Sequence, residues 1–380
     1  MDIQNLKDNI STTPAFIVDE EDISNALTQL QKLRESSGCQ VLYSIKSLSL
    51  SSVLALAKPY VDGFSTSSLF ESQLAHEILS GSGSIHLTTP GIRPDEIEAL
   101  SQFCTHISFN SLNQQQRFAP VCRGRASVGL RVNPKLSFVK DERYNPCRQH
   151  SKLGVDIDSL WLSGNIDELQ GLHLHTMFGA TNYVPLIQSM AKLSDYLSDK
   201  LARLDWLNLG GGYLFHQIAN QQPFIDLVTQ LKSRFNLEVY IEPGNAIVKS
   251  AGYLVASVID VFVSDGKTIV ILDTSVNHNP EVFEYTAQPE LHEHNAKGRH
   301  AVILAGGTCL AGDIFGEYRF NEPLTIGDKV VFKNVGAYSL VKASRFNGQN
   351  LPSVYMHRSG RLKLVKQFGY EDFRRAWWAD

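Results

Sequence analysis

Residues 39–68 read CQVLYSIKSLSLSSVLALAKPYVDGFSTSS and hold one complete strand–helix–strand unit. Val41–Ile45 is an apolar run with the length of a buried strand, and the Ser/Leu-rich stretch 47–60 is typical of a helix. The segment 61–68 is predicted as a second strand that ends in hydroxyl side chains. Lys46 places a primary amine where the first strand ends. The unit therefore combines an α/β pattern with an unusual cation at a strand terminus.

The same alternation runs outward in both directions. Strand and helix patterns alternate about eight times over residues 16–244, and polar or unusual residues recur at the carboxyl ends of the strands. Eight such units predict a TIM-like (β/α)8 barrel, whose catalytic groups lie at that face. A doubly wound sheet has the same alternation. The number of units, and the absence of G-x-G-x-x-G at the first strand–helix turn, favour the barrel.

From about Asn245 onward the pattern changes. Long β-branched segments, separated by glycine-containing turns such as Asp265-Gly266, replace the helical spacing until "YEDFRRAWW" near the end. We therefore expect a barrel over 21–244 and a β-domain over 245–380. A short strand within residues 1–20 is expected to return and pair with the β-domain.

Bulk composition excludes several function classes. The chain has 380 residues, 43% hydrophobic and 19% charged residues, and a net charge of -4, which does not favour a nucleic-acid partner. No stretch approaches the roughly 18 apolar residues of a membrane span, and the start of the chain has no signal-peptide pattern. The five cysteines are scattered without a C-x-x-C pair, so we expect no disulfide framework, no metal site and a cytoplasmic location.

Lys46 has two interpretations. Most lysines at strand edges extend an ammonium into solvent. The alternative is a Schiff-base lysine, whose pKa is lowered by burial so that the neutral amine can attack an aldehyde.

Three further strand ends favour the second interpretation. Gly210, Gly211 and Gly212 in "NLGGG" could cradle a phosphate with backbone amides, or form a tight turn without a ligand. Glu242 in "IEPG" could hold a pyridinium nitrogen protonated. His175 in "GLHLHT" could stack on a ring, although a buried core histidine is the commoner finding.

The β-domain adds two candidate segments. "GGTCLAGD" places Cys309 and Asp313 on a glycine-rich turn, where a cysteine is either an accessible thiol or an inert structural one. "VGAYSLVK" adds Tyr338.

Together, "YSIKS", "GLHLH", "NLGGG", "EPG", "GGTCLAGD" and "AYSLVK" resemble the alanine-racemase-like, fold type III decarboxylases that use pyridoxal 5′-phosphate. Within that group the chain is most similar to carboxynorspermidine/carboxyspermidine decarboxylases. Their features recur along nearly the whole chain, from "TPAF" through "CLAGD" and "FNGQNLPSV" to the closing "FGYEDF".

The resemblance implies a role for each candidate. The cofactor would be held by Lys46, His175, Gly210, Gly211, Gly212, Glu242 and Tyr338. Cys309 would donate a proton inside the barrel of a partner subunit, which implies a homodimer with shared active sites. A small amine or amino-acid substrate would be bound by Asp313, His278 and Asp273.

Two positions depart from the family pattern. The segment "HTMFGATNY" lacks the carboxylate that usually follows the stacking histidine, and Asn245 replaces an acidic residue after "EPG". Less negative charge would weaken the binding of a long polycation. Alternative functions are therefore decarboxylation of a related aminopropyl-carboxylate in a natural-product pathway, racemisation on the same fold, or non-catalytic binding of pyridoxal phosphate.

Overall fold

A computed structural model describes residues 2–163 and 169–379. The chain forms two compact units. One contains Ser24–Ala246, and the other combines Met1–Ile23 with Ile247–Asp380. The N-terminal segment therefore folds with the C-terminal half of the chain.

The first unit is the predicted barrel. Its eight parallel strands follow the order β5-β4-β3-β2-β10-β9-β8-β6, and pairing of β5 with β6 closes the sheet. The strands are β2 (Gln40–Ser44), β3 (Gly63–Thr66), β4 (Ser84–Thr88), β5 (His106–Phe109), β6 (Ser127–Asn133), β8 (Gly171–His173), β9 (Trp206–Asn208) and β10 (Glu238–Ile241). The two-residue β7 (Val155–Asp156) pairs with the end of β6. Because the sheet is closed, the prediction of a barrel is confirmed and the alternative of an open, doubly wound sheet is excluded.

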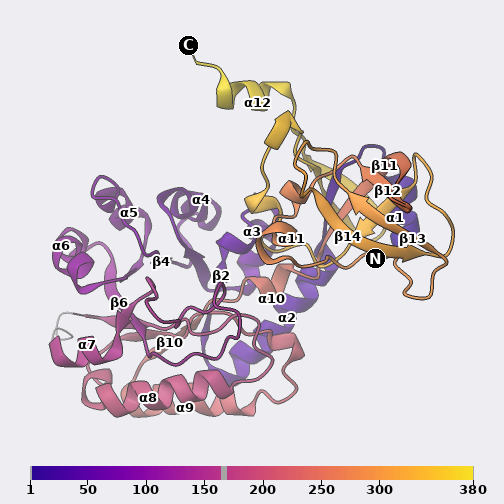
Figure 1. Cartoon of the computed structure of the whole chain (residues 1–380). Helices are drawn as coiled ribbons and strands as arrows, with labels where there is room; N and C mark the ends of the chain where they lie inside the picture. Colours follow the sequence, from indigo (N-terminus) through magenta and orange to yellow (C-terminus); the bar gives the residue numbers. More distant parts are fainter. Residues whose placement is uncertain (1, 164–168, 380) are drawn as a thin grey trace. The chain divides into compact units, whose positions relative to one another are not determined.

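Helices lie outside this sheet, as Figure 1 shows for α4 to α9. They are α2 (Glu20–Ser37), α3 (Ser51–Ala57), α4 (Leu69–Leu79), α5 (Ile97–Phe103), α6 (Leu112–Cys122), α7 (Ile157–Ser163), α8 (Val184–Leu201), α9 (Gln222–Phe235) and the short α10 (Asn245–Val248). Ser68 and Ser111 begin α4 and α6 as N-caps, accepting the amides of Glu71 and Gln114. Such caps satisfy amides that have no partner inside the helix.

Small residues make room for one large side chain in the barrel interior. Trp206 is buried, and a Cβ added to Gly171 would lie 2.0 Å from its indole. A Cβ on Gly129 would lie 2.4 Å from the same ring. Two glycines on neighbouring strands thus allow β9 to carry a tryptophan into a closely packed interior.

The second unit is a mixed sheet in the order β14-β13-β12-β11-β1-β16-β17, with β15 also paired to β11. Its strands are β1 (Ala15–Asp19), β11 (Gly252–Ser264), β12 (Lys267–Leu272), β13 (His300–Ala305), β14 (Ile314–Phe320), β15 (Lys329–Phe332), β16 (Ser353–Arg358) and β17 (Arg361–Lys366). β1 lies between β11 and β16, antiparallel to the first and parallel to the second. Asp265 and Gly266, with φ of 46° and 76°, form the hairpin turn between β11 and β12.

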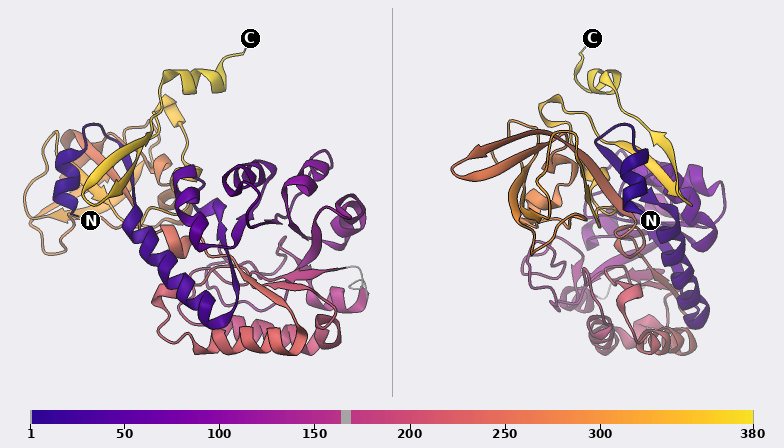
Figure 2. Two further views of the ribbon diagram at one scale, coloured as in Figure 1. Left: turned by 180° about the vertical axis from the view of Figure 1, so that it is seen from behind. Right: turned by 90° about the vertical axis from the view of Figure 1, so that its right-hand side faces the viewer.

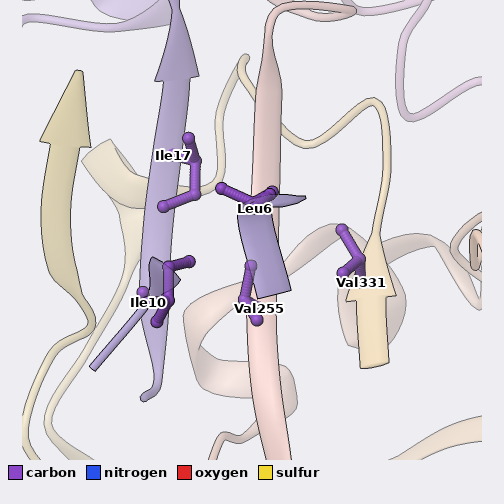
Figure 3. Packing of buried hydrophobic residues seen from close by; sticks show 6 residues of the cluster. Leu6, Ile10, Ile17, Val255 and Val331 are labelled. Atoms are coloured by element: carbon purple, nitrogen blue, oxygen red, sulfur yellow. The ribbon is translucent and has the colours of Figure 1, made fainter. Parts of the chain in front are cut away.

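Helix α1 (Ile3–Asn9) covers part of this sheet. Figure 3 shows Leu6 and Ile10 beside Ile17 of β1, Val255 of β11 and Val331 of β15. All five are buried, so the N-terminal segment contributes both a strand and a packed helix. The remaining helices of this unit are α11 (Glu281–Tyr285) and α12 (Tyr370–Trp377). Among the described residues, no helix is long and apolar enough to cross a membrane.

Candidate active site

A cavity of about 590 Å³ opens at the carboxyl ends of the barrel strands. Lys46 and His175 both line it, together with Ser67 after β3, Thr88 of β4 and Arg131 of β6. A second cavity of about 530 Å³ is lined by residues before and at the start of β6, including Arg123 and Ser127, at the opposite end of the strand. The first cavity is the candidate site because barrel enzymes carry their chemistry at the carboxyl face.

Lys46 follows β2 on a single 3₁₀ turn, Ile45–Ser47, between buried neighbours. Its side chain is accessible where it lines the cavity. Burial lowers the pKa of Lys46, the nearby charge of Glu242 raises it in part, and Arg131 lowers it further. The net lowering enlarges the fraction of neutral, nucleophilic amine.

Glu242 lies immediately after β10 and is buried. Its carboxylate accepts hydrogen bonds from Asn208 Nδ2 at 2.9 Å and from His173 Nε2 at 3.3 Å. Burial alone would raise the pKa of Glu242, but His173, Lys46 and His175 outweigh it and hold the pKa well below its ordinary value.

Burial lowers the pKa of His173, and the neighbouring Glu242 opposes that lowering in part. We assign its Nε2 as the hydrogen-bond donor to Glu242. Supported in this way, the carboxylate is a fixed negative charge beneath the cavity.

His175 lies two residues beyond β8, in a loop. Its Nδ1 accepts the backbone N–H of Gly211 at 3.1 Å, which leaves the proton of the neutral ring on Nε2. Burial and the neighbouring charges of Lys46 and Arg131 hold the pKa of His175 well below its usual value. The ring is thus a neutral group with a fixed orientation on the cavity wall.

The three glycines are required by close backbone packing. Gly210 and Gly212 have φ of 68° and 93°, in the left-handed region that favours glycine. A Cβ on Gly211 would lie 2.2 Å from the carbonyl oxygen of Glu242. Two of the amides already have acceptors, since Gly210 N–H donates to Asn208 and Gly211 N–H to His175. The segment therefore offers fewer unpaired amides than its sequence indicated.

Four site residues were missed by sequence reasoning. Arg131 is buried and its guanidinium approaches the carbonyl of His175 at 3.4 Å, while burial lowers its pKa to about 10. Glu71, whose pKa is raised by burial, accepts the amide of Ser67 at 2.7 Å. His173 and Asn208 support Glu242. For Arg131, His173 and Asn208, the available signal was a polar side chain within an apolar strand, as in "GLRVN".

The long loop after β6 forms one wall of the cavity. It contributes Tyr144, whose ring stacks on Phe178 with centroids 4.7 Å apart and an interplanar angle of 12°. It also contributes the side chains of Arg143, Arg148, Lys152 and Glu142, and Arg143 is ion-paired with Asp141 of the same loop at 2.7 Å. Phe178 belongs to the segment "HTMFGATNY" that lacks the expected carboxylate.

The remaining candidates lie in the β-domain. Cys309 is an exposed free thiol, and its amide donates to Asn347 Oδ1 at 2.8 Å. Tyr338 is half-buried with φ of 60°, and the Lys342 ammonium lies 5.9 Å from its ring centroid.

The three substrate-binding candidates have partners within their own unit. Asp313 is buried and accepts hydrogen bonds from Val276 N–H and from the amide and hydroxyl of Thr308. Asp273 accepts hydrogen bonds from Thr13 and Ser257, and the buried His278 contacts Thr274 through Nδ1 at 2.9 Å. Each of these three side chains thus has a structural role in the β-domain.

The barrel residues fit pyridoxal phosphate by their chemistry. An amine of lowered pKa faces a cavity, an ionised carboxylate lies close to it, and a neutral imidazole and a buried guanidinium complete the wall. These groups match an aldehyde, a pyridinium nitrogen, a ring face and an anionic oxygen respectively.

Known proteins are similar to this chain in sequence and in overall fold. The family model described as pyridoxal-dependent decarboxylase, C-terminal sheet domain, matches residues 15–336. The chain is 32% identical to carboxyaminopropylagmatine decarboxylase of Synechocystis sp., over 95% of this chain and 94% of that one. It is also 32% identical to carboxynorspermidine/carboxyspermidine decarboxylase of Herminiimonas arsenicoxydans, over 95% and 98% of the two chains.

One solved structure of a protein with a related name is similar to this chain in fold. Carboxynorspermidine decarboxylase of Campylobacter jejuni, crystallised with norspermidine, superimposes with a TM-score of 0.87 at 29% identity. The match covers 96% of this chain and all of the other.

Proposed function

The chain belongs to the pyridoxal-dependent decarboxylases, and from that premise we propose that it removes the α-carboxylate of a carboxylated polyamine. The substrate would be of the carboxynorspermidine or carboxyspermidine type, and the products would be the corresponding amine and CO₂. The observation that carries the proposal is the cavity amine of Lys46, with its lowered pKa, close to the ionised Glu242.

The cofactor would be held mainly by residues of the barrel. Lys46 would bind its aldehyde carbon, Glu242 its ring nitrogen and His175 one ring face. The phosphate would be bound at Gly210–Gly212 and by Tyr338, with the amide of Gly212 and the tyrosine hydroxyl as donors. Bound pyridoxal phosphate supplies an electron sink for the charge that develops as CO₂ leaves.

The protein's own residues prepare the proton transfers. The neutral amine of Lys46 can take up a proton as well as attack a carbonyl, because burial lowers its pKa. Glu242 remains ionised, since hydrogen bonds from Asn208 and His173 stabilise its charge. Cys309 would hold a proton on Sγ and deliver it to the substrate carbon that has lost its carboxylate.

The resemblance to fold type III decarboxylases leads us to propose a homodimer. The thiol is exposed on a turn of the β-domain, while Lys46 lies in the barrel. In a homodimer, each Cys309 would enter the barrel of the partner subunit, so that two shared sites form. We propose a cytoplasmic location, because an exposed catalytic thiol requires reducing conditions.

The burial of Asp313 limits how the predicted substrate ligands could reach a substrate. Asp313, Asp273 and His278 were predicted to bind substrate ammonium groups, and these roles remain predictions. Because the Asp313 carboxylate is buried and already accepts three hydrogen bonds, a substrate ammonium would reach it only if the turn rearranged.

A second substrate class is favoured by the cavity wall. Arg148 and Lys152 line the cavity beside Glu142, while Arg143 is ion-paired with Asp141, and no carboxylate follows His175 in "HTMFGATNY". Such a wall disfavours a long polycation. A related aminopropyl-carboxylate with fewer ammonium groups is therefore the alternative substrate, whereas neither racemisation nor non-catalytic binding has a specific observation in its favour.

The test uses purified protein and a panel of carboxylated polyamines and shorter aminopropyl-carboxylates. We expect CO₂ release with at least one member and an absorbance band of bound cofactor. Lys46→Ala should abolish both, whereas Lys363→Ala, at an exposed position, should change neither. Full activity of Lys46→Ala would contradict the proposal.

A further inference from the structure

The face of β4 that points into the barrel is polar. Ser84, His86 and Thr88 alternate with apolar residues, so all three lie on one face of the strand. The ring of His86 lies 4.4 Å from that of Tyr240 and 6.0 Å from that of Trp206, on strands across the interior. Helices α4 to α9 cover the other side of the barrel strands (Figure 1 and Figure 2). Barrel interiors are usually filled by branched apolar side chains, so β4 departs from the common pattern.

These three side chains carry buried atoms that lack a hydrogen bond. Ser84 Oγ, Thr88 Oγ1 and both ring nitrogens of His86 have no partner among the described residues. His86 is only 2% exposed. Buried polar groups in folded proteins are nearly always hydrogen-bonded, either to protein or to ordered water, and an imidazole always carries at least one N–H. His86 therefore requires a partner.

The rings packed against His86 do not supply that partner. His106 stacks on it face to face, with an interplanar angle of 12°, and its own Nδ1 contacts Thr105 Oγ1 at 2.9 Å. The hydroxyl of Tyr240 donates to Glu238 at 2.6 Å. The indole N–H of Trp206 donates to Ser127 at 2.8 Å. Each polar atom of these neighbours that forms a printed contact points to another residue.

The layer of side chains next to His86 is the one that contains Glu242. Tyr240 precedes Glu242 by two residues, and Trp206 precedes Asn208 by two, so each pair lies on one strand face. Burial lowers the pKa of His86 most and His106 lowers it further, while the charges of Glu242 and His173 act on it with opposite signs. His86 therefore lies within electrostatic reach of the pair formed by His173 and Glu242.

His173 also has an atom without a partner. Its Nε2 lies 3.3 Å from the Glu242 carboxylate, but its buried Nδ1 has no hydrogen bond among the described residues. If the ring is uncharged and its proton is on Nε2, Nδ1 needs a donor; if the ring is charged, Nδ1 needs an acceptor. A water molecule meets either need, and buried waters typically make about three hydrogen bonds to such groups.

We propose that an ordered water bridges His86 and Nδ1 of His173, and that His86 thereby positions His173 as the hydrogen-bond donor to Glu242. His86 is then a positioning residue, since it acts on the carboxylate only through the water and His173. The inference rests on the proposed function for the role of Glu242 at the cofactor ring nitrogen. Thr88 lines the cavity and has an unpartnered hydroxyl, which provides a polar route for water from the cavity.

A crystal structure of the cofactor-free natural protein, at a resolution that shows ordered waters, tests the bridge directly. We expect a water within hydrogen-bond distance of both a His86 nitrogen and His173 Nδ1. The same structure of His86→Phe should lack that water. Absence of the water from the natural protein would overturn the inference.

Two substitutions of His86 separate hydrogen bonding from packing. His86→Phe keeps a ring against Tyr240 and Trp206 but has no nitrogen, whereas His86→Gln loses the ring and keeps a donor and an acceptor. We expect His86→Phe to raise the Kd for pyridoxal phosphate about 10-fold, and His86→Gln to raise it less than about threefold, because a buried partner is lost only in the first. A packing role predicts the reverse order.

His106→Phe is the matched control, because it makes the same change in the other ring of the stack. It should leave the Kd unchanged. Absorbance titration of the cofactor-free proteins with pyridoxal phosphate measures all four Kd values, and far-UV circular dichroism shows that each variant is folded. If His86→Phe does not fold, the crystal structure of the natural protein decides alone.

The outcomes distinguish this inference from the proposed function. Equal Kd values for the natural protein and His86→Phe, equal losses in both His86 variants, or the reverse order would overturn the inference even if the water is present. The bridging water and the expected order of Kd values, together with no CO₂ release from any substrate of the panel, would overturn the proposed function and support the inference.

Discussion

Nδ1 of His175 accepts the backbone N–H of Gly211 at 3.1 Å. This contact joins the loop after β8 to the glycine segment after β9, so the ring predicted to stack on the cofactor is oriented by the segment predicted to bind its phosphate. A disturbance of either segment should therefore affect the other.

Gly211→Ala tests that coupling. Its new Cβ would lie 2.2 Å from the carbonyl oxygen of Glu242, so backbone must move. We expect a loss of about 1–3 kcal/mol in the free energy of unfolding, together with reduced cofactor occupancy. Gly91→Ala is the matched control, because its Cβ would meet nothing within 4 Å. Denaturant melts and cofactor absorbance measure both effects, and equal behaviour of the two variants would contradict the packing argument.

Glu242→Gln tests the buried charge. The amide keeps nearly the same size but removes the negative charge that faces Lys46 and loses its match to the donors Asn208 and His173. We expect kcat/KM to fall about 100-fold, comparable to loss of one preorganised electrostatic group. Asp260→Gln, on an exposed part of β11, should leave the rate unchanged. Steady-state CO₂ release is the measurement, and a loss under threefold would contradict the assigned role.

The histidines inside the barrel predict a pH dependence of stability. His86 and His106 stack with ring centroids 3.9 Å apart, and neither nitrogen of His86 has a hydrogen-bond partner among the described residues. Burial lowers the pKa of His106 to about 4, with Glu238 opposing, and lowers that of His86 well below its usual value. The unfolded chain therefore binds more protons below about pH 6.5, and stability falls as the pH falls from there toward 4.

Tm measured from pH 7.5 to 4.5 checks this expectation. Each such histidine contributes a slope of at most about 1.4 kcal/mol per pH unit in that window. His106→Phe should flatten the curve, whereas His292→Phe, at an exposed position, should not. A natural protein whose Tm is constant down to pH 4.5 would contradict the assignment of neutral barrel histidines.

Complementation of two inactive variants tests the shared site. Lys46→Ala and Cys309→Ala should each be inactive as homodimers. After mixing and exchange of subunits, about half of the dimers are mixed, and each holds one intact site, so about a quarter of natural activity should return. No recovery, with subunit exchange shown by differently tagged chains, would mean that Lys46 and Cys309 act within one chain.

Local patterns in the sequence were sufficient for the barrel, the β-domain and the strand-end residues Lys46, His175, Glu242 and Gly210–Gly212. Periodicity reports which side chains a strand or helix buries, and a polar residue at the end of an apolar run stands out against it. Such information lies within a few residues of each position, so no tertiary structure is needed to read it.

Only the folded chain decided which groups surround those residues. Asn208 and His173 reach Glu242 because β9 and β8 follow β10 in the closed sheet, although the residues are 34 and 69 positions away in sequence. In the sequence, Asp313 is an acidic residue on a glycine-rich turn, which led to its prediction as a substrate ligand. In the structure, its carboxylate accepts hydrogen bonds from Val276 and Thr308 inside the β-domain. Hydrogen bonding and desolvation depend on neighbours in space, and strand order sets those neighbours only after the sheet has closed.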